Sequence, residues 1–145
     1  MPTNMEIERF WAMPNRYTFK IPVVAKLLRL EMGGPDWLDP FSGIYSPAPY
    51  RNDADEDIKA DYHFDGLEFL LAQDSAVWDG VLFDPPYSTE QALRKYKPKH
   101  GGTAGRAEYW ARCKDEIARI VKPDGKTICF GWDSTGIGKK RGFVL

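Results

Sequence analysis

The chain of 145 residues predicts an α/β fold with a mainly parallel sheet. Short apolar runs alternate along it with longer segments whose apolar residues recur at helical spacing, and such alternation is typical of this fold class. Hydrophobic residues make up 43% and charged residues 28% of the chain, which are ordinary values for a soluble globular protein. The length suits one domain, so we expect a single domain over residues 1–145.

A helix and two short strands are predicted in the first part of the chain. Apolar side chains at residues 21–30 recur at helical spacing, and two glycines and a proline at residues 33–35 end that helix. An apolar step at residues 37–38 indicates a strand that runs into a turn at residues 39–43. A second strand is expected to end near residues 52–53, although the prolines before it compete with a strand.

Two helices alternate with two strands in the remainder. Residues 65–71 show helical spacing, and the apolar run at residues 78–83 indicates a strand buried on both faces of a parallel sheet. A longer helix is predicted over residues 107–121, followed by a turn at residues 122–125 and a strand at residues 126–132. The predicted order is therefore helix, strand, strand, helix, strand, helix, strand.

The charge and the cysteines exclude several classes of protein. The formal net charge is −1, so any contact with nucleic acid must come from a local basic patch. Cys113 and Cys129 do not have the Cys-x-x-Cys spacing of a metal site, and we expect no metal. The first residues do not resemble a signal peptide, and no apolar run is long enough to span a membrane. We expect a soluble, cytoplasmic protein.

The predicted chemistry rests on Asp84-Pro85-Pro86-Tyr87, the four residues that follow the strand at residues 78–83. Proline has no backbone N–H, so two prolines in succession cannot continue the hydrogen bonds of a sheet and predict a rigid loop. Asp84 offers a carboxylate acceptor, and Pro85 offers a carbonyl that the next proline holds in place. Tyr87 offers a ring on which a nucleic-acid base could stack, an interaction worth roughly 1–3 kcal/mol.

These acceptors suit the methylation of an aromatic amine. The N6 amino group of adenine is a poor nucleophile, because its lone pair is conjugated with the ring. Acceptors that bind both amino hydrogens pull the nitrogen toward tetrahedral geometry and free the lone pair for an electrophilic methyl group. Ligands of open α/β sheets bind beyond the carboxyl ends of the strands. Asp39 and Asp84 both follow predicted strands, so we expect them to face one crevice.

Asp84-Pro85-Pro86-Tyr87 after an apolar strand resembles the catalytic motif of the S-adenosylmethionine-dependent amino-methyltransferases that act on DNA bases, in particular on adenine N6. The turn Asp39-Pro40-Phe41-Ser42-Gly43 resembles the cofactor loop of that family. The chain departs from the family at Ile44-Tyr45-Ser46, where the family has small residues. The resemblance runs from about residue 15 to residue 132, and its motifs occur in the order of the family.

Four further residues resemble cofactor contacts of that family. Lys20, two residues before a proline that opens a helix, is similar to the segment beside the methionine end of the cofactor. Asn52 and Asp53 resemble, less closely, the acidic position that binds the ribose hydroxyls. Asp65 resembles the carboxylate that meets the cofactor adenine, and it also suits the N-cap of the following helix.

The resemblance implies a Rossmann-like methyltransferase domain that methylates adenine N6 in DNA and releases S-adenosylhomocysteine. The family has a seven-stranded sheet, whereas this chain ends where the final strand hairpin would stand, so we expect a reduced domain or a fragment. No separate target-recognition domain is evident. Specificity for a DNA sequence would therefore come from loops or from a partner subunit.

A basic segment follows the predicted catalytic motif and is a candidate clamp for DNA phosphates. Its basic residues are Arg94, Lys95, Lys97, Lys99 and Arg106. Such a segment is also often an ordinary solvated surface. Lys139-Lys140-Arg141 adds a second basic cluster, and residues 53–74 are mostly acidic, so the charge is segregated along the chain.

Other functions remain open from the sequence. The same chemistry would serve cytosine N4, or a base in RNA. A non-catalytic module that binds S-adenosylmethionine or nucleic acid is an alternative of another class. An unrelated nucleotide-binding domain is disfavoured, because the chain has neither Gly-x-Gly-x-x-Gly nor a Gly-x-x-x-x-Gly-Lys-Ser/Thr phosphate loop.

Overall fold

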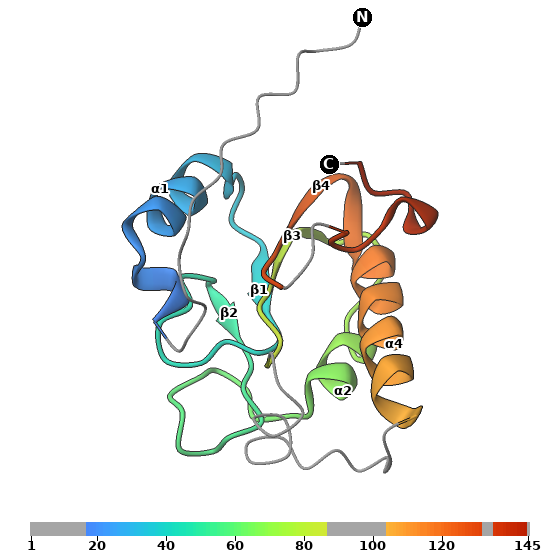
Figure 1. The fold of residues 1–145 in the computed structure, drawn as a ribbon, viewed down its shortest axis with the longest axis horizontal. Coiled ribbons are helices and arrows are strands. Elements are labelled where there is room, and N and C mark those ends of the chain that lie inside the picture. The colour runs from blue at the N-terminus through green and yellow to red at the C-terminus, as the bar shows by residue number, and fades with distance from the viewer. Residues whose placement is uncertain (1–16, 87–103, 132–134, 145) are drawn as a thin grey trace, which may run out of the picture.

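The computed structural model describes residues 17–86, 104–131 and 135–144, and of residues 104–106 it describes the backbone alone. These residues form a parallel sheet between two layers of helices (Figure 1). The strands are β1 (Trp37–Asp39), β2 (Tyr50–Arg51), β3 (Trp78–Phe83) and β4 (Val121–Cys129). The helices are α1 (Pro22–Glu31), α2 (Gly66–Leu71) and α4 (Ala104–Ile120), with 3-10 turns at Thr18–Lys20 and Lys139–Arg141.

The sheet has the strand order β2-β1-β3-β4, and all three pairings are parallel. Leu38 of β1 pairs with Tyr50 on one side and with Val81 on the other. Beyond β2, a single parallel bridge joins Asn52 to Tyr62. The α/β class and the parallel sheet predicted from the sequence are confirmed, and the elements follow the predicted order along the described chain.

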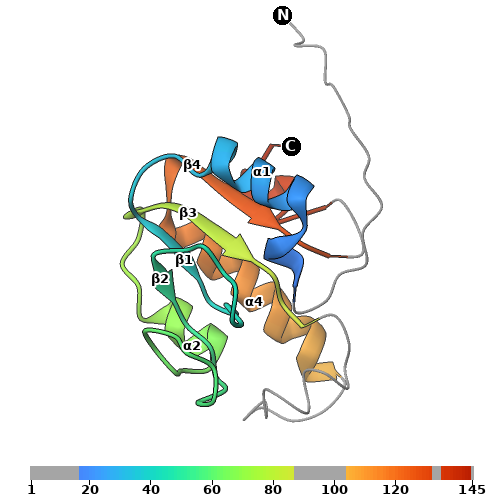
Figure 2. The ribbon, with the colours of Figure 1, turned by 90° about the vertical axis from the view of Figure 1, so that its left-hand side faces the viewer.

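Apolar residues cover both faces of the sheet, as expected for buried parallel strands. On one face Trp37 and Leu82 pack with Leu28 of α1. On the other face Val81 and Phe83 belong to the core that includes residues of α2 and α4. Figures 1 and 2 show α1 on one side of the strands and α2 and α4 on the other. The described sheet therefore has a core of buried side chains on each of its faces.

A glycine lets the sheet accommodate a large side chain. Gly80 of β3 pairs with Trp37 of β1, and Trp37 is 1% exposed. A Cβ atom at Gly80 would lie 2.5 Å from the indole ring, closer than van der Waals contact permits. The position next to Trp37 therefore requires glycine.

The predicted boundaries at the end of the chain need correction. The sequence predicts a turn at residues 122–125 and a strand at 126–132, whereas β4 runs from Val121 to Cys129. Its pairing with β3 shifts register, moving from Trp78–Val121 to Gly80–Lys126, so the predicted turn is an irregularity within one strand. The strand ends at Cys129 because its partner β3 ends at Phe83, before Asp84 and the two prolines.

No helix among the described residues is both long enough and apolar enough to cross a membrane.

Candidate functional site

Two acidic residues lie at the carboxyl ends of neighbouring strands. Asp39 is the last residue of β1, Asp84 directly follows β3, and these strands pair in parallel. Asp84 is half-buried, and its charge contributes to raising the pKa of Asp39. The two carboxyls therefore lie near each other beyond the sheet, where α/β proteins bind their ligands.

The carboxyl of Asp39 is fully buried at this corner. It accepts a hydrogen bond from the Ser46 hydroxyl at 2.6 Å and another from the backbone N–H of Phe41 at 3.0 Å. Burial raises the pKa of Asp39 to about 8, because it penalises the charged form. The two hydrogen bonds lower that pKa, whereas the charges of Asp84 and Asp53 raise it. Asp39 therefore holds a proton at neutral pH.

The turn after β1 is packed into the core, and residues 40–42 are buried. The ring of Phe41 meets the rings of Phe83 and Trp110 edge-on, with centroids 6.0 Å and 5.5 Å away. A Cβ atom at Gly66 would lie 2.3 Å from the Phe41 ring. Phe41, which the resemblance assigns to the cofactor loop, thus packs its side chain between the sheet and the helices α2 and α4.

Asp53 holds the turn after β1 against the loop after β2. It is 1% exposed, and its two carboxylate oxygens accept from the backbone N–H groups of Gly43 at 2.8 Å and of Asp55 at 3.0 Å. Gly43 has a φ of +59°, a left-handed conformation that favours glycine. Asp53 also lies close enough to Asp39 to affect its pKa, so this corner holds three carboxyl groups.

Asn52 uses its side chain to join two loops. Its amide nitrogen donates to the carbonyls of Pro40 at 3.1 Å and Phe64 at 2.9 Å, and its amide oxygen accepts from the N–H of Phe64 at 2.9 Å. Asn52 is fully buried. The side chain that resembles a ribose contact therefore binds the backbone of the protein itself.

Asp65 is the N-cap of α2, as its position in the sequence predicts. One carboxylate oxygen accepts from the N–H groups of Leu67 and Glu68, and the other accepts from the Tyr109 hydroxyl at 2.9 Å. Burial raises the pKa of Tyr109, so this hydroxyl keeps its proton and remains a donor. Asp65 joins the start of α2 to α4, and its predicted contact with adenine stays a prediction.

Lys20 contacts an aromatic ring of the segment after the turn. It is exposed, and its Nζ stands 4.0 Å from the centroid of the Tyr45 ring, a cation–π contact. Tyr45 in turn stacks on Tyr17, with 5.6 Å between ring centroids. Lys20 therefore packs against the segment that departs from the family pattern.

Part of the predicted site lies outside the described residues. Pro85 and Pro86 are half-buried beyond β3. Tyr87 and the basic residues Arg94, Lys95, Lys97 and Lys99 fall in the range that the structure does not describe. Arg106 is in the first turns of α4, where only the backbone is described.

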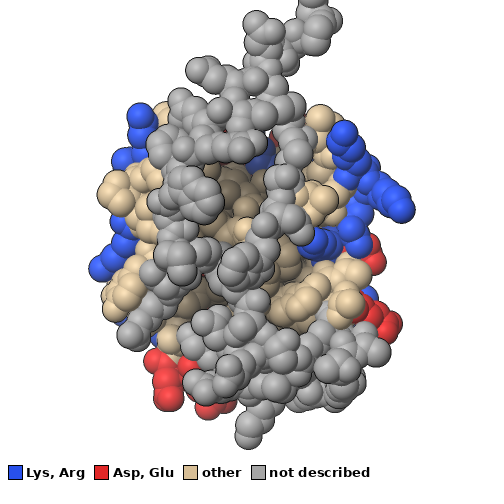
Figure 3. Space-filling model, in the orientation of Figure 1, with Lys and Arg blue, Asp and Glu red and all other residues tan. Residues whose placement is uncertain are grey.

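On the described surface, Lys and Arg side chains flank the view of Figure 3, and most of the Asp and Glu side chains lie in its lower half.

The corner fits S-adenosylmethionine in part. Two further carboxyl groups, those of Asp53 and Asp84, lie near the protonated Asp39 and would attract a positive sulfonium. Asn52 and Asp65 fit less well, because their side chains already bind groups of the chain. In the described part of the chain, no cluster of three or more His, Cys, Asp or Glu side chains is arranged to hold a metal ion.

A cavity that the sequence analysis missed lies at the edge of the sheet. Its volume is about 470 Å³. Its walls are Tyr50 of β2, Trp78 of β3, Glu68, Phe69, Ala72 and Gln73 along α2 and its C-terminus, and Tyr62 and Phe64 before that helix. The one signal in the sequence was a cluster of aromatic residues within an acidic segment, and neither helical nor strand periodicity assigns that cluster a role.

The fold and the site define an α/β protein with a parallel sheet and an acidic corner at the carboxyl ends of its strands. Comparison of the chain with protein-family models, curated proteins and solved structures gives no significant match. Its function is therefore argued from its own residues.

Proposed function

We propose that the protein transfers a methyl group from S-adenosylmethionine to the exocyclic N6 amino group of adenine in DNA. The observation that supports this most is the position of Asp84, half-buried directly beyond β3 and within electrostatic range of Asp39 at the end of β1. A carboxylate followed by two prolines at this edge of a parallel sheet suits an amine substrate.

The cofactor supplies an electrophilic methyl group on a positive sulfur. Asp84 and the Pro85 carbonyl accept the two amino hydrogens of the base, so that the nitrogen lone pair points at the methyl carbon. A bound S-adenosylmethionine would supply the methyl group and leave as S-adenosylhomocysteine, and the methylated amino group held by Asp84 would release one proton to solvent. Holding the two reactants in line contributes much of the rate enhancement.

The protonation state of Asp39 matters for this reaction. The sulfonium charge disappears during methyl transfer, so carboxylates that stabilise it before the reaction oppose the transition state. With a pKa of about 8, Asp39 is neutral at pH 7. Asp84 can then accept a hydrogen bond from the substrate amine, while the neutral Asp39 adds no negative charge beside the cofactor.

Transfer of a labelled methyl group to duplex DNA tests the proposal. We expect methylated product with the unaltered chain, and mass spectrometry of the nucleosides should identify N6-methyladenine rather than N4-methylcytosine. Asp84→Ala should reduce the rate about 100-fold or more, by analogy with loss of a positioned polar group. Asp57→Asn, at an exposed acid in the same protein, should leave the rate unchanged.

Calorimetry with S-adenosylmethionine separates the possible failures. An Asp84→Ala variant that still binds the cofactor but does not transfer the methyl group supports the catalytic assignment. Equal rates for Asp84→Ala and the unaltered chain would refute it. Cofactor binding without any methylated product on DNA or RNA would indicate a non-catalytic module that binds S-adenosylmethionine.

A further inference from the structure

The cavity at the sheet edge is lined mainly by aromatic side chains. Five of its eight lining residues are aromatic: Tyr50, Tyr62, Phe64, Phe69 and Trp78. They meet in loose pairs, with the rings of Tyr62 and Phe69 5.5 Å apart and those of Tyr50 and Trp78 5.0 Å apart and nearly perpendicular. Tyr62 and Phe64 remain 42% and 53% exposed, so the aromatic walls are open to a ligand from solvent.

The charge around this cavity is negative. Glu68 is the one charged residue among the lining residues, and it is exposed at the rim. The cavity also borders the segment 53–74, which carries eight acidic residues and a single lysine. Among the described residues, the buried indole N–H of Trp78 has no hydrogen-bond partner, and this neutral group adds no positive charge to the cavity. A cation is therefore favoured over an anion.

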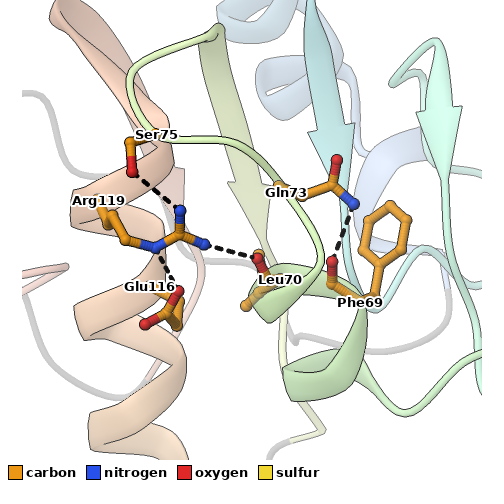
Figure 4. Close-up of polar contacts among 6 residues, drawn as sticks. All are labelled: Phe69, Leu70, Gln73, Ser75, Glu116 and Arg119. Carbon is orange, nitrogen blue, oxygen red and sulfur yellow. Dashed lines mark hydrogen bonds and ion pairs between the residues drawn. The ribbon is translucent and has the colours of Figure 1, made fainter.

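The walls are held in place from behind. Arg119 of α4 donates to the Leu70 carbonyl at 3.2 Å and to the Ser75 hydroxyl at 3.0 Å, and it pairs with Glu116 at 2.6 Å (Figure 4). On the cavity side, Gln73 donates to the carbonyl of Phe69 at 2.9 Å, which closes the end of α2 (Figure 4). A fixed wall lowers the cost of ordering side chains when a ligand binds.

The opposite wall is fixed by the loop after β2. Asp53 N–H donates to the Tyr62 carbonyl at 3.1 Å, and Tyr62 N–H donates to the Arg51 carbonyl at 3.1 Å. The backbone of Phe64 binds the Asn52 amide on both its N–H and its carbonyl. The aromatic rings thus project from backbone that is already hydrogen-bonded.

We propose that this cavity binds an organic cation of the alkylammonium type, with choline as the simplest representative. Aromatic faces attract such cations through the negative charge of their π-systems, and quaternary ammonium groups are recognised by aromatic cages. Glu68 adds a carboxylate at the rim, where a positively charged head group would pass or rest. The proposal is independent of methyl transfer, because its residues do not include those of the acidic corner.

Nuclear magnetic resonance titration of the whole ¹⁵N-labelled chain with choline, at constant ionic strength, tests the proposal. We expect saturable shifts of the Ala72 and Gln73 amides and of the Trp78 indole N–H. The probe 3,3-dimethyl-1-butanol has nearly the shape of choline but lacks its charge. It should bind about tenfold more weakly, because it cannot make the cation–π interaction.

Substitutions in the cavity wall, each with a matched control elsewhere, test whether choline binds in this cavity. Tyr62→Leu should weaken choline binding about fivefold or more, and Glu68→Gln should weaken it less and reduce its dependence on salt. Two controls, Tyr17→Leu and Asp74→Asn, replace an exposed tyrosine and an exposed acid that do not line the cavity, and they should leave binding unchanged. Binding of the neutral alcohol as tight as that of choline, no saturable shift, or equal binding by Tyr62→Leu would each overturn the proposal.

Discussion

The acidic corner and the aromatic cavity both take residues from the loop after β2, and they satisfy their polar groups differently. At the corner, the buried side chains of Asp39, Asn52 and Asp53 each accept or donate at least two hydrogen bonds within the chain. At the cavity, aromatic rings make up most of the wall, and the buried Trp78 N–H has no partner in the part of the chain that the structure describes. The structure of the corner therefore depends on hydrogen bonds between buried polar groups, whereas the cavity is enclosed by aromatic side chains that leave a space between them.

This difference has an energetic consequence. A buried polar group that loses its partner costs the free energy of its desolvation, so the corner should tolerate few substitutions. A half-exposed ring at the rim of a cavity loses little when it is shortened, because solvent already reaches it. Substitutions in the wall of the cavity should therefore cost the fold less than substitutions at the corner.

The largest expected effect is that of Asn52→Ala. The substitution leaves the carbonyls of Pro40 and Phe64 and the N–H of Phe64 without their partner in a buried position. We expect the free energy of unfolding to fall by about 3–5 kcal/mol, as measured by urea denaturation. Tyr62→Leu, at the rim of the cavity, should cost about 1 kcal/mol or less. Similar losses for the two variants would remove the contrast between the regions.

The second expected effect concerns the dependence of stability on pH. Asp39→Asn should remove the part of this dependence that comes from Asp39. The pKa of Asp39 is about 8 in the folded protein and has an ordinary value of 3.8, so between these values the folded chain holds a proton that the unfolded chain has released. Stability from this group is fully present below pH 3.8 and is lost as the pH rises toward 8. Asparagine carries no charge, and its amide oxygen can accept from the Phe41 N–H while its amide nitrogen donates to the Ser46 hydroxyl oxygen.

Thermal unfolding across this pH range measures the effect. The melting temperature of the unaltered chain should fall with pH more steeply than that of Asp39→Asn, and the variant should be the more stable of the two in mild alkali. Asp57→Asn, at an exposed position, should follow the unaltered chain. If the melting temperatures of the unaltered chain and of Asp39→Asn fall with pH in parallel, the pKa of Asp39 is not raised in the folded protein.

A loss smaller than that of Asn52→Ala is expected for Arg119→Met, behind the cavity. The guanidinium binds the Leu70 carbonyl, the Ser75 hydroxyl and Glu116, but the side chain is partly exposed. We expect a loss of about 1–2 kcal/mol by urea denaturation, since solvent can replace part of these contacts. Arg112→Met, at an exposed position of the same helix, is the matched control. A loss as large as that of Asn52→Ala would mean that the cavity wall also depends on polar pairing.

Local periodicity predicted most of the fold. The apolar run of β3 and the helical spacing in α2 are signals within a few residues, and the structure confirms both. The boundary of β4 was wrong, because Pro123 and Gly125 are turn formers in isolation and their place inside the strand depends on the register with β3. Such a shift is set by pairing between distant segments, which a single sequence does not display.

The site was predictable only where strand ends define it. The parallel arrangement of two strands brings Asp39 near Asp84, and this follows from fold class alone. The use of Asn52 as a link between loops did not follow, because its partners lie twelve residues away on either side. The cavity was missed because its rings come from four segments, and no spacing in the sequence relates Tyr50 to Trp78.

The amide of Asn52 contacts both regions, since it binds Pro40 in the turn after β1 and Phe64 in the wall of the cavity. Displacement of either segment must therefore strain the bonds to the other. Thermodynamic linkage makes such an effect reciprocal: if a ligand of the cavity alters affinity at the corner, a ligand of the corner alters affinity at the cavity by the same factor. One buried carboxamide thus couples the positions of the turn after β1 and of the cavity wall, and ligands at the two proposed sites would act on each other through it.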